Sequence, residues 1–328
     1  MRGRGPRDGV RAEASAGAWL LRLLGILLMV SAVLLALSRA PDRSVESLVA
    51  RWAPPPSDFI DLDGQLVHLR DVGPRGDPLP VLLLHGTSAS LHTWEGWVEQ
   101  LKPYRRVISV DLPGFGLTGP RADGDYRGDA DARFVLALLD RLQVTRAVLA
   151  GNSLGGEVAW RVATLAPERV AMLVLVDAGG LPLAPGLLPL GWRIAQAPVL
   201  GRAMQWWLPR AMVVQGLTQV YADPARITDR VVDRYFELTL RQGNRRALGE
   251  RLRQRDWGAD AERIATITQP TLILWGAEDR LLPRPMADEF ARRIAGSRLV
   301  VLEGLGHVPQ EEDPARSFEP VRTFLGLP

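Results

Sequence analysis

The chain of 328 residues contains no cysteine. This absence excludes a thiol nucleophile and any disulfide, and it leaves the redox compartment of the protein open. The sequence also lacks a His-x-x-x-His pair and carboxylates clustered at ligand spacing, so it predicts neither a metal site nor a bound cofactor. With 40 basic and 37 acidic residues, there is no excess of positive charge that would predict a broad nucleic-acid-binding surface.

A short glycine-rich motif, Gly-Asn-Ser-Leu-Gly-Gly, occupies residues 151–156. An apolar segment rich in strand formers, 145–150, precedes it, and residues 157–166 after it have the spacing and composition of a helix. A serine on a sharp turn between a strand and a helix is a nucleophile elbow. This context predicts that Ser153 is a nucleophile, although the bare Gly-x-Ser-x-Gly pattern occurs often by chance.

The glycines of this motif have a steric reason. The turn crowds the positions two before and two after the serine, and Gly151 and Gly155 carry no Cβ that would clash there. In this geometry the Ser153 hydroxyl stands clear of the sheet, and the Leu154 N–H points to the place where an oxyanion forms. We therefore expect Leu154 to supply one donor of an oxyanion hole.

The loop after an apolar strand at 81–84 offers a second oxyanion donor. The strand ends in His85-Gly86-Thr87, and in this arrangement the loop after the third strand supplies a backbone N–H, which we assign to Thr87. His85 precedes the oxyanion glycine, Gly86, and we expect it to hold the loop by hydrogen bonds.

Two candidates complete a catalytic serine site. Asp279 lies just past the carboxyl end of a predicted strand, where the active sites of open α/β sheets gather. His307 follows the last apolar segment, 298–302, and is the one of the four histidines in the position of a catalytic base. The chain order Ser153, Asp279, His307 is the one expected for a strand–turn–helix serine site. Asp177, at the end of another predicted strand, is the alternative carboxylate, and the Gly-x-Glu-Asp context favours Asp279.

Together these motifs resemble the α/β-hydrolase superfamily, in particular its serine hydrolases with a helical cap. The resemblance covers residues 57–328 and rests on His85-Gly86, Asp111-Leu112-Pro113-Gly114-Phe115-Gly116, the elbow at Ser153, Gly276 to Asp279, and Gly306-His307. It implies an α/β fold with a mostly parallel eight-stranded sheet, helices on both faces and a helical cap insert. By this similarity Ser153 is the nucleophile, His307 the general base and acid, and Asp279 the orienting carboxylate.

The resemblance implies an esterase- or lipase-like enzyme that cleaves carboxylic esters of apolar small molecules through an acyl-enzyme on Ser153. Serine at the elbow argues against relatives that cleave carbon–halogen bonds or epoxides, which use aspartate there. Carbon–carbon bond hydrolases of ring-cleavage products often share the Asn-Ser-x-Gly-Gly elbow and are a second candidate. This chain has Thr87-Ser88-Ala89 and Val308 where they tend to have glycine-proline-glycine and tryptophan. A perhydrolase is a third candidate, and a non-catalytic membrane-anchored ligand-binding protein is a candidate from a different class.

The remaining strands follow a regular order. Two apolar segments, 59–62 and 66–69, flank Asp63-Gly64, which predicts an antiparallel hairpin at the sheet edge. His68 in this hairpin and His92 are interpreted as structural. Parallel strands are expected at 81–84, 107–110, 146–150, 172–176, 271–275 and 298–302, separated by helices such as 129–142.

The N-terminus predicts a membrane-spanning helix. Four arginines, at positions 2, 4, 7 and 11, precede residues 17–37, in which Arg22 is the sole charge. A helix of this length reaches about 31 Å, enough to cross the hydrocarbon core. The basic flank places residues 1–16 in the cytoplasm and the catalytic body outside it. The alternative is a signal peptide with its apolar part at 23–37, cleaved near Ala36-Leu37-Ser38, which would release a secreted enzyme.

The segment from Gly180 to Thr268 interrupts the alternation of strands and helices and predicts a lid over the site. Its apolar side chains suggest an acyl or alkyl pocket, and they could also touch a bilayer; they include Leu187, Leu188, Leu190, Trp192, Trp206 and Trp207. Nine arginines between residues 226 and 255 are interleaved with acids, and we interpret them as a solvated, ion-paired helix face. The predicted organisation is a basic tail at 1–16, an anchor or signal sequence at 17–37, a linker at 38–56, a core at 57–180 and 269–328, and a cap at 181–268. Within the linker, residues 51–56 are expected to form a short, stiff segment.

Overall fold

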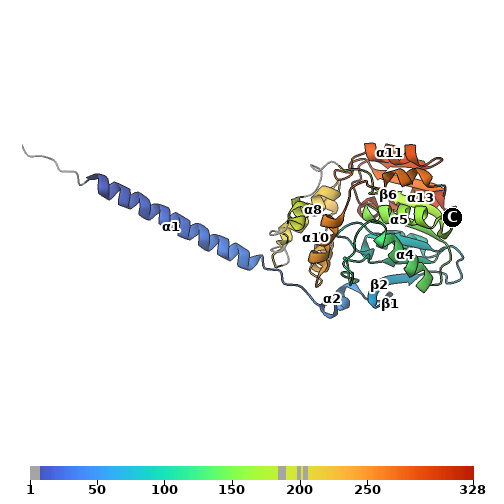
Figure 1. Ribbon diagram of the computed structural model, residues 1–328, viewed down its shortest axis with the longest axis horizontal. Coiled ribbons are helices and arrows are strands. Elements are labelled where there is room, and N and C mark those ends of the chain that lie inside the picture. The colour runs from blue at the N-terminus through green and yellow to red at the C-terminus, as the bar shows by residue number, and fades with distance from the viewer. Residues whose placement is uncertain (1–7, 184–189, 198–200, 202–205) are drawn as a thin grey trace, which may run out of the picture.

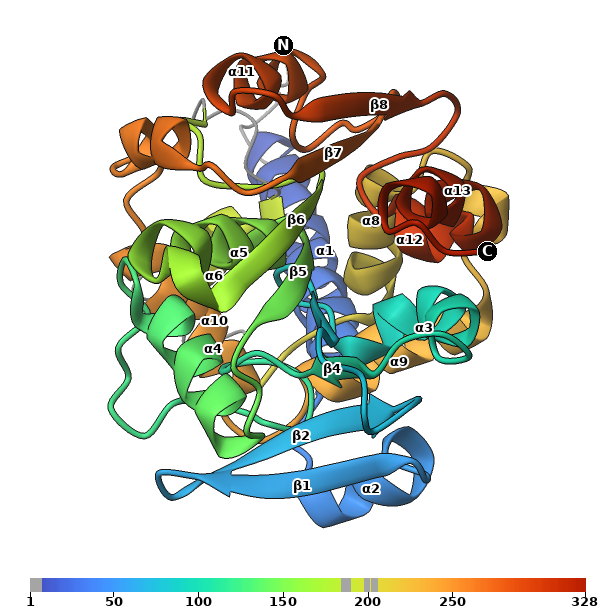
Figure 2. The same cartoon turned by 90° about the vertical axis from the view of Figure 1, so that its right-hand side faces the viewer.

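The computed structural model describes residues 8–183, 190–197, 201 and 206–328, so that Leu187 and Leu188 of the predicted pocket lie outside the described residues. At its centre is an eight-stranded sheet in the order β1-β2-β4-β3-β5-β6-β7-β8. β2 runs antiparallel to β1 and to β4, and the other neighbours are parallel. The strands are β1 (Ser57–Leu62), β2 (Gln65–Val72), β3 (Val81–Leu84), β4 (Val107–Val110), β5 (Ala147–Asn152), β6 (Val170–Val176), β7 (Thr271–Gly276) and β8 (Arg298–Leu302). The predicted mostly parallel sheet is confirmed (Figure 2).

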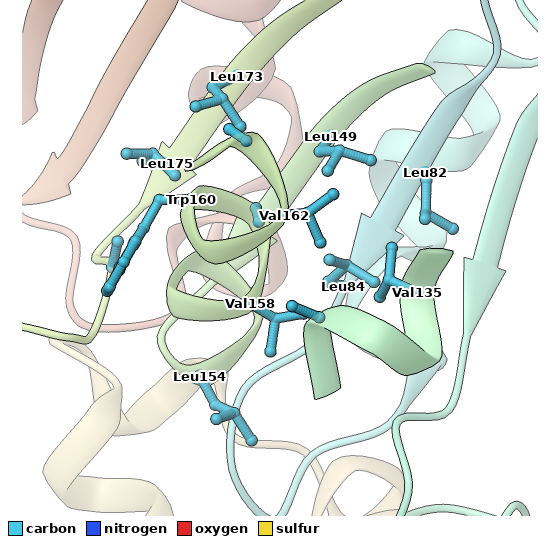
Figure 3. Close-up of a cluster of buried hydrophobic side chains, with 14 of the residues drawn as sticks. Leu82, Leu84, Val135, Leu149, Leu154, Val158, Trp160, Val162, Leu173 and Leu175 are labelled. Atoms are coloured by element: carbon cyan, nitrogen blue, oxygen red, sulfur yellow. The ribbon is translucent and has the colours of Figure 1, made fainter. Parts of the chain in front are cut away.

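Helices cover both faces of this sheet. One face carries α4 (Ala130–Arg141), α5 (Leu154–Leu165) and α11 (Pro285–Arg293), and the other carries α3 (Glu95–Leu101) and α13 (Pro314–Phe324), on which α12 (Pro309–Glu312) packs. Within β3, Leu82 and Leu84 pack on the first face, while Val81 and Leu83 pack on the second. Burial on both faces explains why β3 is continuously apolar. Figure 3 shows the first face, with Trp160 of α5 against the sheet. Short 3-10 helices are η1 (Leu91–Trp94), η2 (Pro167–Arg169), η4 (Pro224–Arg226) and η5 (Ala261–Thr266).

The hairpin of β1 and β2 closes the edge of the sheet as the sequence predicted. Asp63 and Gly64 have φ values of 53° and 82°, and positive φ at both positions is the signature of the tight type I′ turn. In β2, the buried His68 places Nδ1 2.7 Å from Asp111 Oδ2, which ties the hairpin to the loop after β4. His92 Nε2 lies 2.8 Å from a backbone carbonyl, and burial lowers the pKa of His92 to about 3, so that the ring is neutral.

The N-terminal helix α1 (Asp8–Leu37) projects away from the rest of the molecule (Figure 1). Residues 17–36 are long and apolar enough to cross a membrane by length and composition, and none of this stretch is buried against the protein. A signal sequence near an N-terminus meets the same criteria.

The segment predicted as a linker, 38–56, contains a helix. This helix, α2 (Val45–Trp52), occupies its central part and is followed by the proline run. Leu48 and Trp52 are buried in one cluster with Leu117 of the core and Leu238 of the cap. The segment between α1 and the sheet is therefore packed onto the body, because the apolar positions of α2 lie on one face and find a partner surface.

The insert between β6 and β7, called the cap below, forms the helices α6 (Leu190–Gln196), α8 (Arg210–Val220), α9 (Asp229–Thr239) and α10 (Asn244–Gln254). Figure 1 shows α8 and α10 between α1 and the sheet. The interpretation of its arginines as a solvated face is wrong for Arg234, Arg245 and Arg251, which are buried. Arg251 of α10 pairs with Asp131 of α4, and Arg234 of α9 pairs with Glu311 of α12. Sequence spacing identifies a charged helix face, but it does not reveal whether acidic residues of another element pack over that face.

Candidate active site

Ser153 occupies the turn between the end of β5 and the start of α5. Its φ of 54° and ψ of −115° lie outside the regions that residues with a side chain normally adopt, so the backbone is strained. The Ser153 N–H donates to Val176 O of β6 at 3.0 Å, which holds the turn against the sheet. Because the N-terminus of α5 carries a partial positive charge, negative charge that develops beside Ser153 is stabilised there.

Glycines make the room that this turn needs. A Cβ on Gly151 would collide with the carbonyl of Gly155, and a Cβ on Gly155 would collide with the carbonyl of Leu84 in β3. A Cβ on Gly86 would lie 3.1 Å from Ser153 Cβ. The loop after β3 and the elbow therefore approach each other more closely than side chains at these glycine positions would allow.

The second pair of predicted residues lies at the same end of the sheet. His307 Nδ1 is 2.7 Å from Asp279 Oδ2, and both side chains are buried. Asp279 Oδ1 accepts hydrogen bonds from the backbone N–H groups of Leu281 and Leu282, at 2.8 and 2.9 Å. With both oxygens engaged, the carboxylate has one orientation, which fixes the His307 ring and leaves its Nε2 for another partner.

The histidine loop is joined to the elbow and to the cap. Asn152 Nδ2, beside Ser153, donates to His307 O at 2.9 Å, and the His307 N–H donates to Val220 O at the end of α8 at 2.7 Å. Ser153 and His307 line one cavity. The structure thus brings the three predicted triad residues to one place, while their catalytic roles remain a prediction.

Asp177, the alternative carboxylate, lies next to Asp279. Its Oδ1 accepts from the Gly276 N–H at 2.9 Å, and among the described residues its buried Oδ2 has no hydrogen-bond donor. Burial, together with the Asp279 carboxylate, raises the pKa of Asp177 well above its usual range. Both effects favour the neutral form of Asp177 relative to its carboxylate, and it is Asp279 that reaches the imidazole of His307.

Asp177, Asp279 and His307 also offer ligand atoms within 4.8 Å of one another, the compactness that a metal ion requires. The sequence predicted no metal site, because these residues are far apart in the chain and only folding brings them together. His307 Nδ1 and Asp279 Oδ2 already share a hydrogen bond, which is the contact that a His–carboxylate pair makes in a serine site.

The oxyanion side of the site is formed by the loop after β3. Leu112 N donates to His85 Nε2 at 2.9 Å, so the proton of this ring is on Nδ1, which donates to Gly86 O at 2.7 Å. Burial lowers the pKa of His85, in agreement with a neutral ring. Thr87 lines the cavity beside Ser153, and Leu154 begins α5, whose first N–H groups have no partner within the helix.

The cavity above Ser153 has a volume of about 320 Å³. Its floor comes from the loop after β3, the elbow and the histidine loop, and its walls come from the cap. The cap side chains are mainly apolar and include Trp192, Leu208, Met212, Val213, Leu217 and Leu248. Trp192 lines this pocket, whereas Trp206, one of the paired tryptophans that suggested an apolar pocket, is 64% exposed.

The sequence model of the alpha/beta hydrolase fold matches residues 80–314. The chain belongs to the α/β-hydrolase family. The dihydrolipoyllysine-residue acetyltransferase component of the acetoin cleaving system of Pseudomonas putida is 31% identical over 283 residues, which cover 83% of this chain and 70% of that protein. The 2-hydroxymuconate semialdehyde hydrolase of Pseudomonas sp. strain CF600 is 30% identical over 262 residues, 76% of this chain and 88% of that protein.

Among solved structures, a bacterial membrane phospholipase A matches this α/β-hydrolase with a TM-score of 0.69 and 24% identity, over 96% of this chain and 98% of that one. At this identity the likeness shows the fold alone. The coverage is high enough that the match includes part of α1.

The hydrolase also contains a site residue that sequence reasoning missed. Glu312 of α12 is buried and accepts hydrogen bonds from the N–H groups of Gly306, Ala222 and Asp223, at 2.8, 3.2 and 2.9 Å. It thereby joins the histidine loop to the end of α8. No motif marks this position, and only the docking of the cap reveals its role.

Proposed function

We propose that the protein is a serine hydrolase that cleaves carboxylic esters of apolar molecules through an acyl-enzyme on Ser153. The observation that carries the proposal is the cavity, which combines an elbow serine, an imidazole paired with a carboxylate, and mainly apolar walls. An apolar acyl group gains free energy by burial there, about 0.8 kcal/mol for each CH₂ group. The proposal includes a core at 57–180 and 269–328 and a cap at 181–268.

The reaction follows from the proposed roles. His307 Nε2 takes the proton from Ser153 Oγ while Oγ attacks the ester carbonyl, and the N–H groups of Thr87 and Leu154 stabilise the oxyanion. Asp279 holds Nδ1–H and stabilises the imidazolium. The C–O bond to the alcohol then breaks, and His307 returns the proton to the leaving oxygen. Water, deprotonated by His307, attacks the acyl-enzyme and releases the acid and free Ser153.

A carbon–carbon bond hydrolase is the second candidate, since a relative at 30% identity is a 2-hydroxymuconate semialdehyde hydrolase. A muconate-type substrate carries a carboxylate, which a cation in the pocket would stabilise. Among the described lining residues the permanent cation is Arg245, and its guanidinium pairs with Asp42 at 2.5 Å. This pairing favours a neutral ester.

The N-terminal helix supports a proposal on location. We propose that residues 17–37 anchor the protein in a membrane, with residues 1–16 in the cytoplasm and the catalytic domain outside it. The helix has the length and apolarity of a membrane span and lies free of the body, and arginines flank its start.

Kinetics with matched substrates tests the proposal. The purified full-length protein should hydrolyse p-nitrophenyl esters, and Ser153→Ala should lower kcat by about 10⁶-fold while the melting temperature stays near that of the wild type. A ring-cleavage dienoate assayed in parallel should turn over far more slowly. Faster cleavage of the dienoate would favour the second candidate, and ester hydrolysis by Ser153→Ala at the parent rate would exclude Ser153 as the nucleophile.

A further inference from the structure

The segment that leaves α1 is hydrogen-bonded to the cap. The Ala40 N–H donates to Trp206 O at 3.1 Å, and Arg39 and Trp207 form a β-bridge. Three residues after Ala40, the Arg43 N–H donates to Leu240 O at 2.7 Å, and Arg43 O accepts from the N–H of residue 242 at 2.8 Å. These backbone bonds hold residues 39–43 beside the segment that precedes α8 and the segment that follows α9.

Side chains strengthen the same contact. Ala40 is buried in a cluster with Leu208 and Leu240, and Met212 and Val213 of α8 pack against this cluster. Asp42 accepts from the Gly243 N–H at 3.2 Å and pairs with Arg245 at 2.5 Å. The contact is therefore apolar at its centre and ionic at its edge.

The wall that receives this segment is also a wall of the cavity. Leu208, Met212, Val213 and Arg245 line the space above Ser153. A single layer of cap side chains thus has the exit of α1 on one side and the proposed acyl pocket on the other. The segment does not simply tether the enzyme, since it contacts the part of the cap that would hold the substrate.

The distances place this wall at a membrane surface if α1 spans the bilayer. Ala40 lies three positions after the end of α1 at Leu37, and an extended chain covers about 10 Å over three positions. Trp206, which is 64% exposed, lies at the same contact through its carbonyl. Tryptophan is enriched at membrane–water interfaces, where its ring sits at the level of the headgroups.

We infer that α1 docks the cap on the bilayer, and that the substrate is a lipid ester whose acyl chain passes from the membrane along the Leu208–Met212–Val213 wall to Ser153. This inference rests on the proposed ester hydrolysis and adds the substrate class and its route. The lipid stays partly in the bilayer while its ester carbonyl reaches Ser153. Water hydrolyses the bond, and a fatty acid and an alcohol-bearing lipid are the products.

The test compares one lipid substrate with one soluble substrate. Full-length protein is reconstituted in phosphatidylcholine vesicles that contain a fluorogenic long-chain lipid ester, and p-nitrophenyl butyrate is assayed on the same sample. A flexible Gly-Ser insertion of about 12 residues between Ser38 and Arg39 keeps the contacts of residues 39–43 with the cap and lengthens the connection to α1. We expect lipid hydrolysis to fall about tenfold with the insertion, because the effective concentration of the cap at the bilayer falls, and butyrate hydrolysis to stay within about twofold.

A second variant breaks the contact itself. Ala40→Glu places a charge among Leu208 and Leu240 and should also lower lipid hydrolysis more than butyrate hydrolysis. Ala50→Glu, the same change at an exposed position of α2, is the matched control and should alter neither.

The outcomes separate this inference from the proposed function. Butyrate hydrolysis without any lipid hydrolysis by the wild type would overturn the inference and leave the esterase in place, as would an insertion that lowers neither activity or both equally. A mature chain that begins after residue 36 would also overturn the inference, because α1 would then be absent. A wild type that hydrolyses neither ester would overturn the proposed function itself.

Discussion

Ser153 owes its position to its neighbours along and across the chain. Because Gly151 and Gly155 have no side chain, β5, α5 and β3 pack closely around the turn. The serine there takes a φ of 54° and faces the cavity. At this scale the sequence was most informative, because a strained turn between a strand and a helix needs small residues at fixed offsets. Thr87, in the loop after β3, and Leu154, at the start of α5, remain predictions as oxyanion donors.

The two buried aspartates should respond differently to the same substitution. Asp279→Asn should lower kcat by about 10⁴-fold, because the amide no longer stabilises the His307 imidazolium or its tautomer. Asp177→Asn should retain most of the activity, because a neutral amide can still accept from the Gly276 N–H. Steady-state kinetics on a p-nitrophenyl ester measures both. The reverse order of losses would assign the triad carboxylate to Asp177.

The raised pKa of Asp177 also predicts a pH dependence of stability. The folded-state pKa lies above the unfolded value of about 3.9, so folding takes up a proton between the two values and stability falls as the pH rises through that window. The carboxyl groups that oppose its ionisation, Asp279 and Glu312, are unchanged in Asp177→Asn. The melting temperature of this variant relative to the wild type should therefore increase from pH 5 to pH 8. A difference that does not change with pH would contradict a protonated Asp177.

The cluster of Asp177, Asp279 and His307 gives a metal-removal prediction. If His307 and Asp279 act as a base and its orienting carboxylate, dialysis against EDTA should leave ester hydrolysis unchanged, because no step of the proposed reaction needs a metal ion. Activity that is lost on dialysis and restored by a divalent cation would instead make the three residues metal ligands.

At the scale of elements, the strands could be predicted because burial on both faces makes them continuously apolar, and β3 and β4 begin and end where the sequence indicated. Helix α2 could not be predicted, because its apolar face is buried by Leu117 and Leu238, which are distant in the sequence. For the same reason the arginines of α9 and α10 looked solvated. Their acidic partners come from elements about 75 to 120 residues away in the chain.

The buried pair between α10 and α4 should hold the cap on the core. Arg251→Ala leaves Asp131 buried without its partner, which costs about 3–5 kcal/mol. The matched control is Arg253→Ala, two positions along α10, whose side chain is exposed and pairs with Glu250; this pair contributes at most about 1 kcal/mol. Thermal unfolding and limited proteolysis of the cap measure the effect. Equal melting temperatures for the two variants would show that Arg251 does not dock the cap.

At the scale of the whole molecule, the cap lies between the N-terminal helix and the catalytic sheet (Figure 1). It contacts the segment that follows α1 through Ala40, and helix α4 of the core through Asp131. The sequence predicted an anchor, a linker, a core and a cap, but it did not reveal that residues 39–43 bind the cap or that Glu312 ties the cap to the histidine loop. These contacts join segments that are distant in sequence and carry no motif. They make the cavity a product of segments that are far apart in the sequence.

Covalent labelling of the full-length protein by a fluorophosphonate probe is the sharpest test of the nucleophile. We expect a single adduct, mapped by peptide mass to Ser153, that forms in parallel with the loss of ester hydrolysis and is absent from Ser153→Ala. An enzyme that loses activity through an adduct at another residue, or that keeps hydrolysing esters with Ser153 labelled, would contradict a nucleophilic Ser153.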